Sequence, residues 1–323
     1  RPGYWSSDVC SSVLSVIDAK IIGAWRSSHE VEMGDLLGNA FEVAINGCDS
    51  DKEKVDRISG ELDGKIANYF DSQRFGMRGN NAKVGAYILN NQLEDAAMEF
   101  LTSYENETNE TAREARKQLC EGRDFARALE YFPRYLKNER SMIYQLSKDE
   151  NDFAKALRSL PRGLSIMFIH AVVGLIFNRS LERMVEEKSF ADCKIGCKLN
   201  FYGFPDTDTI TVIGSGNEGM LPAGTLVGYE TRDEEISDYD KETLQALGLK
   251  KESFKIKSMP ELSMRGAYRS FLAPFRDFGY DLTGETLKLR FSLPSGSYAT
   301  ILVNEFTKNE GLDLGKVAPE TNT

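Results

Sequence analysis

The pattern of hydrophobic and polar positions divides the chain into two strand-forming ends and a helical middle. Hydrophobic side chains alternate with other residues over 41–45 and again over 286–293, which is the period of a β-strand. Short β-prone runs also occur within residues 13–25. From residue 84 to residue 187 the pattern instead becomes helical almost throughout.

The longest predicted helix follows Pro161, at about 164–187, and has an apolar first half nearly all round. This indicates a central buried helix of roughly 35 Å. Outside the middle, helices are predicted at 49–62, at 234–247 and at 298–307, where Ser297 is placed to cap the last one. Strand fragments are expected at 209–213 and 226–229. The other predicted helices are 84–89, 93–104, 108–120, 125–130, 135–146 and 152–157.

This order of elements predicts an α+β fold in which strands from both ends form one domain. Residues 13–93 and 267–323 make up that domain, and residues 94–266 form a second, mostly helical α/β domain inserted into it. Residues 1–12 show no clear period, so we leave them unassigned and possibly foreign.

Composition narrows the class of protein. The 323 residues are 41% hydrophobic and 28% charged, as in ordinary globular proteins. The net charge of −10 argues against a non-specific nucleic-acid binder with a basic face, although 40 Lys and Arg residues can still cluster. The longest apolar run, 163–177, is shorter than the roughly 20 residues of a membrane-spanning helix. With no signal peptide visible, we expect a cytoplasmic protein without a membrane segment.

The cysteines indicate free thiols in a reducing compartment, because five is an odd number and the spacing fits no disulfide framework. Cys193 and Cys197 lack the second pair of ligands that a zinc site needs, so no metal site is predicted. Two histidines leave little material for Ser-His-Asp or His-metal chemistry. His170 lies on an apolar face and is interpreted as a core histidine bonded to a neighbour, with a general base or ligand as the alternative.

The segment 68–76 is the strongest candidate for a ligand site. It places two aromatic residues beside Asn68 and then continues as Gln73-Arg74-Phe75-Gly76. Planar side chains, an amide and a guanidinium are the groups that read an exposed nucleobase by stacking and hydrogen bonding. The alternative is a rigid turn that packs Phe70 and Phe75 into a core, and the residues alone leave both interpretations open.

Two further segments have a similar ambiguity. The segment 291–300 is either a strand, turn and helix cap or a corner that places Tyr298 over a ligand ring. The glycine-rich segment 214–219 resembles a phosphate-binding loop but lacks the Lys-Ser/Thr of such loops, so we interpret it as an ordinary loop.

Taken together, these segments resemble the TruD type of tRNA pseudouridine synthase. The family pattern Asn-Tyr-Phe-Gly-x-Gln-Arg-Phe-Gly is matched at 68–76, except that Asp71 replaces a glycine. The ending Phe-x-Leu-Pro-x-Gly-Ser-Tyr-Ala-Thr is matched at 291–300. Between and before them, further family elements are matched in order at 34–41, 160–162, 170–171, 177–178 and 266–269.

The resemblance implies a mixed, largely antiparallel sheet with a large inserted (TRUD) domain. It implies isomerisation of a specific uridine in tRNA, of the position-13 type, with no metal or organic cofactor and no protein partner. It also implies a monomer when full length. By position, Asn68 would bond the target base or its sugar, Phe70 would shape the pocket, and Tyr298 would stack on the base. Gln73 and Arg74 belong to the same substrate-binding motif.

One departure from the family concerns the chemistry itself. The family's catalytic aspartate stands in a Gly-x-Lys-Asp-x-x-Ala-x-Thr-x-Gln motif, and the 323 residues do not contain it. Asp71 lies next to the site but replaces a glycine, so no aspartate is assigned as the nucleophile. We therefore expect a truncated synthase that is inactive alone. The alternative is a non-catalytic RNA-binding module or RNA-folding helper derived from the same fold.

Overall fold

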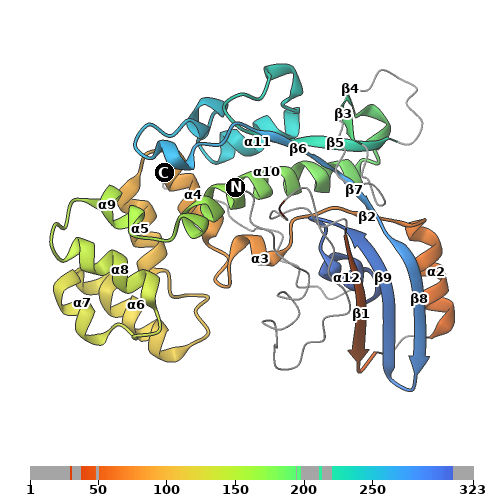
Figure 1. Ribbon diagram of the computed structural model, residues 1–323, viewed down its shortest axis with the longest axis horizontal. Coiled ribbons are helices and arrows are strands. Elements are labelled where there is room, and N and C mark those ends of the chain that lie inside the picture. Colours follow the sequence, from red (N-terminus) through yellow and green to blue (C-terminus); the bar gives the residue numbers. More distant parts are fainter. Residues whose placement is uncertain are drawn as a thin grey trace, which may run out of the picture. The chain divides into compact units, whose positions relative to one another are not determined.

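Figure 1 shows the computed structural model of the chain, which describes residues 30, 38–48, 51–193, 195–197, 211–212 and 220–307. The chain divides into two compact units, residues 1–36 and 37–323, and all elements below belong to the second. The expectations for residues 1–12, 13–25 and 214–219 lie outside the described residues.

The largest interstrand pairing lies in an antiparallel sheet with the order β1-β9-β8. It is formed by β1 (Gly38–Asn46), β8 (Arg276–Thr283) and β9 (Thr286–Pro294). The two alternating segments of the sequence are thus direct neighbours, although they lie about 250 residues apart along the chain. In the register Phe41 faces Phe291, and the two ring centroids are 5.4 Å apart.

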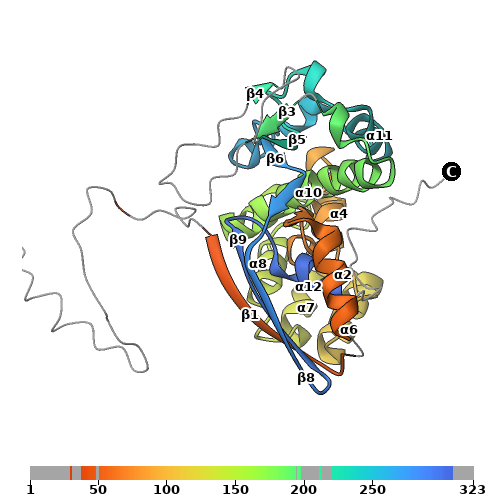
Figure 2. The ribbon, with the colours of Figure 1, turned by 90° about the vertical axis from the view of Figure 1, so that its right-hand side faces the viewer.

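Two helices cover one face of this sheet, namely α2 (Lys52–Leu62) and α12 (Ala299–Thr307), as Figure 2 shows. Their apolar side chains share one hydrophobic cluster with alternate residues of β9 and with strands near it. The helix α2 begins where the Asp51 side chain accepts a hydrogen bond from the Lys54 amide, at 2.7 Å. It ends at Asp63, which lies in the left-handed region and is followed by Gly64.

The predicted helical middle is confirmed. Its elements are α3 (Ser72–Phe75), α4 (Asn81–Leu89), α5 (Leu93–Thr102), α6 (Glu110–Gly122), α7 (Phe125–Tyr131), α8 (Lys137–Leu146), α9 (Phe153–Arg158) and α10 (Arg162–Glu186). After them, α11 (Asp238–Ala246) and short 3₁₀ turns at Phe190–Asp192, Asp233–Glu235, Lys251–Phe254 and Pro260–Leu262 complete the helical elements.

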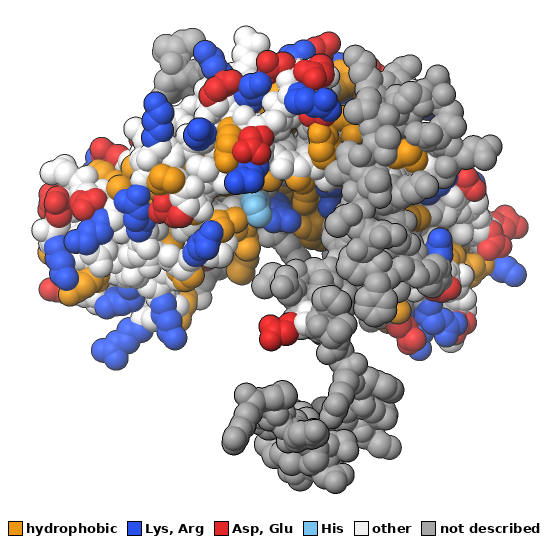
Figure 3. All heavy atoms as spheres, turned by 45° about the horizontal axis from the view of Figure 1, so that its top comes forward, with side chains coloured by type: hydrophobic (Ala, Val, Ile, Leu, Met, Phe, Trp, Pro, Cys, Tyr) orange, Lys and Arg blue, Asp and Glu red, His pale blue; other side chains and the backbone are white. Residues whose placement is uncertain are grey.

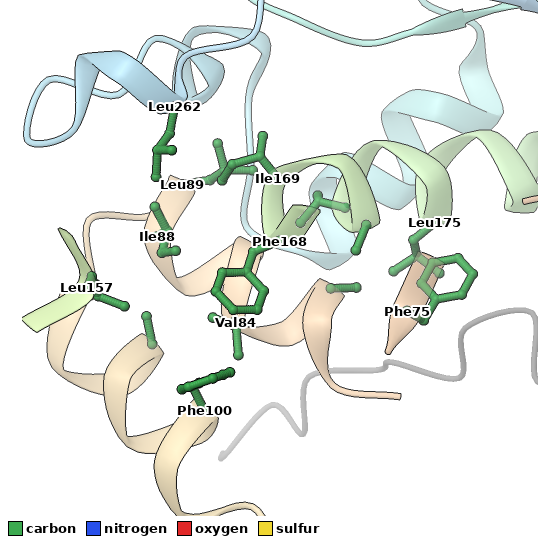
Figure 4. Packing of buried hydrophobic residues seen from close by; sticks show 14 of the residues in the cluster. Phe75, Val84, Ile88, Leu89, Phe100, Leu157, Phe168, Ile169, Leu175 and Leu262 are labelled. Carbon is green, nitrogen blue, oxygen red and sulfur yellow. The ribbon is translucent and has the colours of Figure 1, made fainter. Parts of the chain in front are cut away.

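The helix α10 is the centre of this region, as its uniformly apolar first half predicted. Figure 4 shows Phe168 and Ile169 of α10 between Val84, Ile88 and Leu89 of α4. The two helices approach closely because Gly85 has no side chain: a Cβ there would lie 2.2 Å from the Phe168 carbonyl oxygen.

Within the described residues, α10 is also the one helix long and apolar enough to cross a lipid bilayer. Of its most hydrophobic window, 72% is buried inside the protein. The core helix of a soluble protein meets the same criteria, so length and composition are weak evidence for a span here.

Two smaller sheets correct the strand predictions. β2 (Lys65–Ala67) pairs with β7 (Leu272–Pro274), and neither was predicted, because three residues are too few to show a period. The second sheet has the order β4-β3-β5-β6, from β3 (Ile195–Cys197), β4 (Thr211–Val212), β5 (Leu221–Leu226) and β6 (Ala267–Ser270). β6 follows the predicted domain boundary at 266/267 directly and pairs with β5. The domain boundaries remain predictions.

Two predicted elements were placed wrongly in the sequence. The strand expected at 226–229 lies earlier, because the chain turns after Leu226 and the Gly228 amide donates to Thr231 Oγ1. The helix expected at 234–247 is interrupted, because Ser237 caps α11 by accepting a hydrogen bond from the Asp240 amide.

Candidate functional site

The 68–76 segment follows a strand of a small sheet and does not come directly after the helix predicted at 49–62. β2 ends at Ala67, and the Asn68 amide then donates to the Phe271 carbonyl at 2.8 Å. The short helix α3 follows at Ser72. Strand pairing on one side and a helical turn on the other therefore hold the loop in place.

The Asn68 side chain is buried, and its polar atoms all have partners within the chain. Nδ2 donates to the Ser270 carbonyl at 3.0 Å. Oδ1 accepts from Arg269 Nη2 at 2.7 Å and from Ser297 Oγ at 3.2 Å. In this structure the Asn68 side-chain amide positions Arg269. A hydrogen bond from Asn68 to a base remains a prediction. The Ser297 hydroxyl, predicted to cap the following helix, donates to Asn68.

Arg269 is the residue of this site that sequence reasoning missed. Its Nε donates to the Asn68 carbonyl at 3.1 Å, and its Nη2 also reaches the Gly296 carbonyl at 3.0 Å. Burial lowers the pKa of the guanidinium to about 10, and no carboxylate contributes to that shift among the described residues. The only sequence signal for Arg269 was its place in the family element matched at 266–269 (Gly-x-Tyr-Arg), and that element did not indicate which residue Arg269 contacts.

Phe70 is fixed by its backbone. Its N–H donates to Asn178 Oδ1, and its carbonyl accepts from Asn178 Nδ2, both at 2.8 Å. Asn178 is only 2% exposed and lies on α10, so the clamp ties the loop to the central helix. Phe70 is 6% and Phe75 is 2% exposed, so both rings pack into the core, as in the alternative interpretation of this segment.

The ring of Phe70 is the common neighbour of the predicted site residues. The Tyr298 ring lies edge-on at 6.4 Å between centroids and 68° between planes. The guanidinium carbons of Arg269 and Arg74 lie 4.1 Å and 5.0 Å from the Phe70 ring centroid, within cation–π distance. The structure thus brings Asn68, Phe70, Arg74 and Tyr298 together, whereas Gln73 is exposed to solvent.

Arg74 has an unsatisfied donor. Its Nε is buried without a hydrogen-bond partner, and its Nη1 lies 3.5 Å from His170 Nδ1. Burial, and then the charge of Arg74, lower the pKa of His170, which keeps the imidazole neutral near pH 7. In Figure 3 a histidine side chain (pale blue) lies beside Lys or Arg side chains (blue).

Asp71 has a structural role in this arrangement. Its carboxylate is buried, with Oδ2 accepting from Thr300 Oγ1 at 2.9 Å and Oδ1 accepting from Ser72 Oγ at 3.3 Å. The first of these bonds joins the loop to α12. These bonds agree with leaving Asp71 out of the nucleophile's role.

A rigid turn follows the loop. Gly76 has φ +85°, and a Cβ there would lie 2.8 Å from the Asn81 side chain. Arg78 donates to the Phe100 and Ser103 carbonyls, at 2.9 Å each. Between them Met77 is 98% exposed.

Within the part of the chain that the structure describes, neither a metal centre nor the cavity around α11 coincides with this loop. Among the described residues, no three His, Cys, Asp or Glu side chains are grouped to hold a metal ion. A cavity of about 670 Å³ lies around α11, next to the buried Asp240, whose pKa burial raises. The Asp240 carboxyl accepts from the hydroxyls of Ser180, Ser237 and Thr225, and none of the predicted site residues lines this cavity.

Comparison with known proteins agrees with this geometry. A crystal structure from Methanosarcina mazei, described as a putative tRNA pseudouridine synthase D (TruD), superposes with a TM-score of 0.77. The sequence identity is 27%, over 95% of this chain and 76% of that one. The expected α+β class is therefore confirmed, and the fold is that of a pseudouridine synthase.

Sequence comparison gives the family. The family model described as tRNA pseudouridine synthase D (TruD) matches residues 6–306, and the chain belongs to this family of isomerases. A probable tRNA pseudouridine synthase D from Thermococcus sibiricus is 30% identical, over 93% of this chain and 75% of the relative. One from Archaeoglobus fulgidus is 33% identical, over 91% of this chain and 74% of the relative. The resemblance inferred from the motifs is confirmed.

Proposed function

We propose that the Phe70 site holds a uridine of tRNA for isomerisation to pseudouridine, the activity for which the relatives are named. In this reaction the N1 glycosidic bond breaks, the base turns, and a bond from C5 to the sugar forms. The target base has to leave its stack, at a cost of a few kcal/mol, so the site must offer new contacts to it. We extend the proposal to a uridine of the position-13 type.

The observation that carries the proposal is a pair of guanidiniums around one aromatic ring. Arg74 and Arg269 both lie over Phe70, and neither has a carboxylate partner among the described residues. A buried charge without a partner is unfavourable, and nucleic acid supplies phosphates as partners. The half-buried Tyr298 ring next to Phe70 supplies an aromatic surface for the base.

Each site residue then has a role. Tyr298 stacks on the base, and Phe70 forms the wall of the pocket on which both guanidiniums rest. Arg74 and the exposed Gln73 contact the RNA next to the base. Asn68 orients Arg269 in the structure as it stands, and its contact with the base requires Arg269 or Ser297 to release Oδ1.

We also propose that the chain as printed does not turn over alone, because no residue in it can be assigned the nucleophile's role. The second candidate function, a non-catalytic RNA-binding module, follows from the same missing motif. In either case we propose a cytoplasmic monomer that uses no cofactor and no membrane. Residues 94–266 form its inserted domain, and residues 13–93 with 267–323 form the domain of the Phe70 site.

The experiment is a tRNA-binding titration by fluorescence anisotropy on the chain and on a Tyr298→Ala variant. Loss of stacking is expected to weaken binding by roughly 1–3 kcal/mol. Tyr280→Ala is the matched control, since Tyr280 is also half-buried against the same hydrophobic cluster but lies on β8. Equal binding by both variants would contradict a site at Phe70.

A further inference from the structure

A second surface with the chemistry of an RNA contact lies on α8, on the turn before it and on Lys148 just after it. It consists of four basic and two aromatic residues, which we call the α8 stripe: Arg134, Tyr135, Lys137, Arg140, Tyr144 and Lys148. The one acidic residue in this part of the chain, Glu139, is 8% exposed and pairs with Arg116 at 2.7 Å. The stripe therefore presents positive charge without any exposed negative charge between its members.

Helical spacing places Lys137, Arg140 and Tyr144 on one side of α8, and Lys148 comes just after the helix ends. Lys137, Arg140, Tyr144 and Lys148 follow one another at intervals of three, four and four residues. Lys148 Nζ lies 3.9 Å from the Tyr144 ring centroid, which shows that the last two share a face. The opposite face of α8 is buried, through Glu139, Met142, Ile143 and Leu146.

The two tyrosines expose flat rings. Tyr135 is 58% and Tyr144 is 48% exposed, more than any other large hydrophobic side chain within the described residues except Met77. The Tyr135 hydroxyl donates to Asn109 Oδ1 at 2.9 Å, which fixes the ring at the start of α6. Exposed rings held in place beside cations are the arrangement on which unpaired bases stack.

The charges of the stripe are not neutralised by acidic partners. No ion pair joins Arg134, Lys137 or Lys148 to a carboxylate among the described residues, and Arg140 donates to the Leu129 and Phe132 carbonyls. Apart from the paired Glu139, the nearest acidic residues in sequence are Asp149 and Glu150, directly after Lys148, and Glu130, before Arg134. Figure 3 shows both Lys or Arg (blue) and Asp or Glu (red) side chains over the part of the molecule where Figure 1 labels α6 to α9.

We propose that the α8 stripe binds the sugar–phosphate backbone of the tRNA at a distance from the target uridine. This rests on the proposed function, because it assigns a second contact to the same substrate. The chain has a net charge of −10, so phosphate is repelled by most of its surface and attracted where basic residues gather. Aromatic rings between the cations favour a nucleic acid over an acidic protein surface.

The test compares two triple variants over a range of salt concentrations. Arg134→Gln/Lys137→Gln/Lys148→Gln removes stripe charges, and Arg57→Gln/Lys241→Gln/Arg265→Gln removes three exposed charges elsewhere. Both change the net charge by the same amount, and all six side chains are exposed, so both variants are expected to fold. Anisotropy titrations with whole tRNA and with a short single-stranded RNA carrying the target uridine measure the dissociation constants.

The stripe variant is expected to bind whole tRNA at least tenfold more weakly. The slope of log affinity against log salt concentration should become shallower by about 2–3, because each lost phosphate contact contributes about 0.9. Its affinity for the short RNA should equal that of the unchanged chain. Tyr144→Ala should weaken whole-tRNA binding about tenfold without changing the slope. Equal slopes for the two triple variants, or an equal loss on the short RNA, overturn the proposal. If the unchanged chain does not bind the short RNA, the proposed function itself is contradicted, whatever the two triple variants show.

Discussion

Replacement of Asn178 by leucine should release the loop that carries the site. Asn178 makes two hydrogen bonds of 2.8 Å to the backbone of Phe70, and it is 2% exposed, so water cannot take its place. The variant leaves one N–H and one carbonyl of Phe70 buried without partners. At about 1–3 kcal/mol for each group, the free energy of unfolding should fall by about 2–6 kcal/mol.

Urea unfolding followed by circular dichroism measures this loss, and Asn106→Ala is the matched control. Asn106 is exposed, and its side chain donates to the Arg78 carbonyl at 3.2 Å, so its loss should change stability by less than about 1 kcal/mol. Asn178→Asp keeps the acceptor but places a carboxylate against the Phe70 carbonyl, and it should recover stability when acid protonates that group. An unchanged urea midpoint for Asn178→Leu would contradict the claim that the two hydrogen bonds of Asn178 hold the Phe70 backbone in place.

Three further variants test other parts of the account. Burial and the neighbouring Arg74 guanidinium lower the pKa of His170, so the unfolded chain binds a proton at this histidine before the folded chain does as the pH falls below about 6.5. The free energy of unfolding should therefore decrease below that pH, and it should decrease less in the His170→Gln variant. Gly76→Ala, at φ +85°, should lose about 1–3 kcal/mol in thermal unfolding, whereas Gly122→Ala, with open space around it, should not. Arg116→Met leaves the buried Glu139 carboxylate without its ion-pair partner, and the free energy of unfolding should fall by about 3–5 kcal/mol. Adding Glu139→Leu should restore part of this loss, and no restoration would argue against the ion pair.

The sequence predicted the fold where an element is long enough to show its own period. The helix α10 and the strands β1 and β9 repeat an apolar pattern over many residues. The helix does so because most of it is buried, and the strands do so because one face of each packs against the core. The strand β8 was missed although it has apolar residues in alternation, since Asp277 is in the left-handed region and the register shifts there. Strands of three residues carry no period at all.

The site could be predicted only as far as its residues stand together in the sequence. The motif at 68–76 predicted the loop, and the structure places Arg74 and Tyr298 around the ring of Phe70. The partnership of Asn68 with Arg269 joins residues 201 positions apart, which no local pattern reports. The Asn178 clamp on Phe70 spans 108 positions and was missed for the same reason.

The most direct measurement of the central claim is incubation of the chain with tRNA, followed by mass spectrometry for pseudouridine and by a binding assay on the same sample. The account predicts a tRNA complex that depends on Tyr298 and no pseudouridine, because none of the residues proposed to hold the base is assigned as a nucleophile. Pseudouridine formed by this chain, and lost in Asp71→Asn, would contradict the account, since the buried Asp71 would then perform the chemistry. Absence of any tRNA complex would contradict it as well.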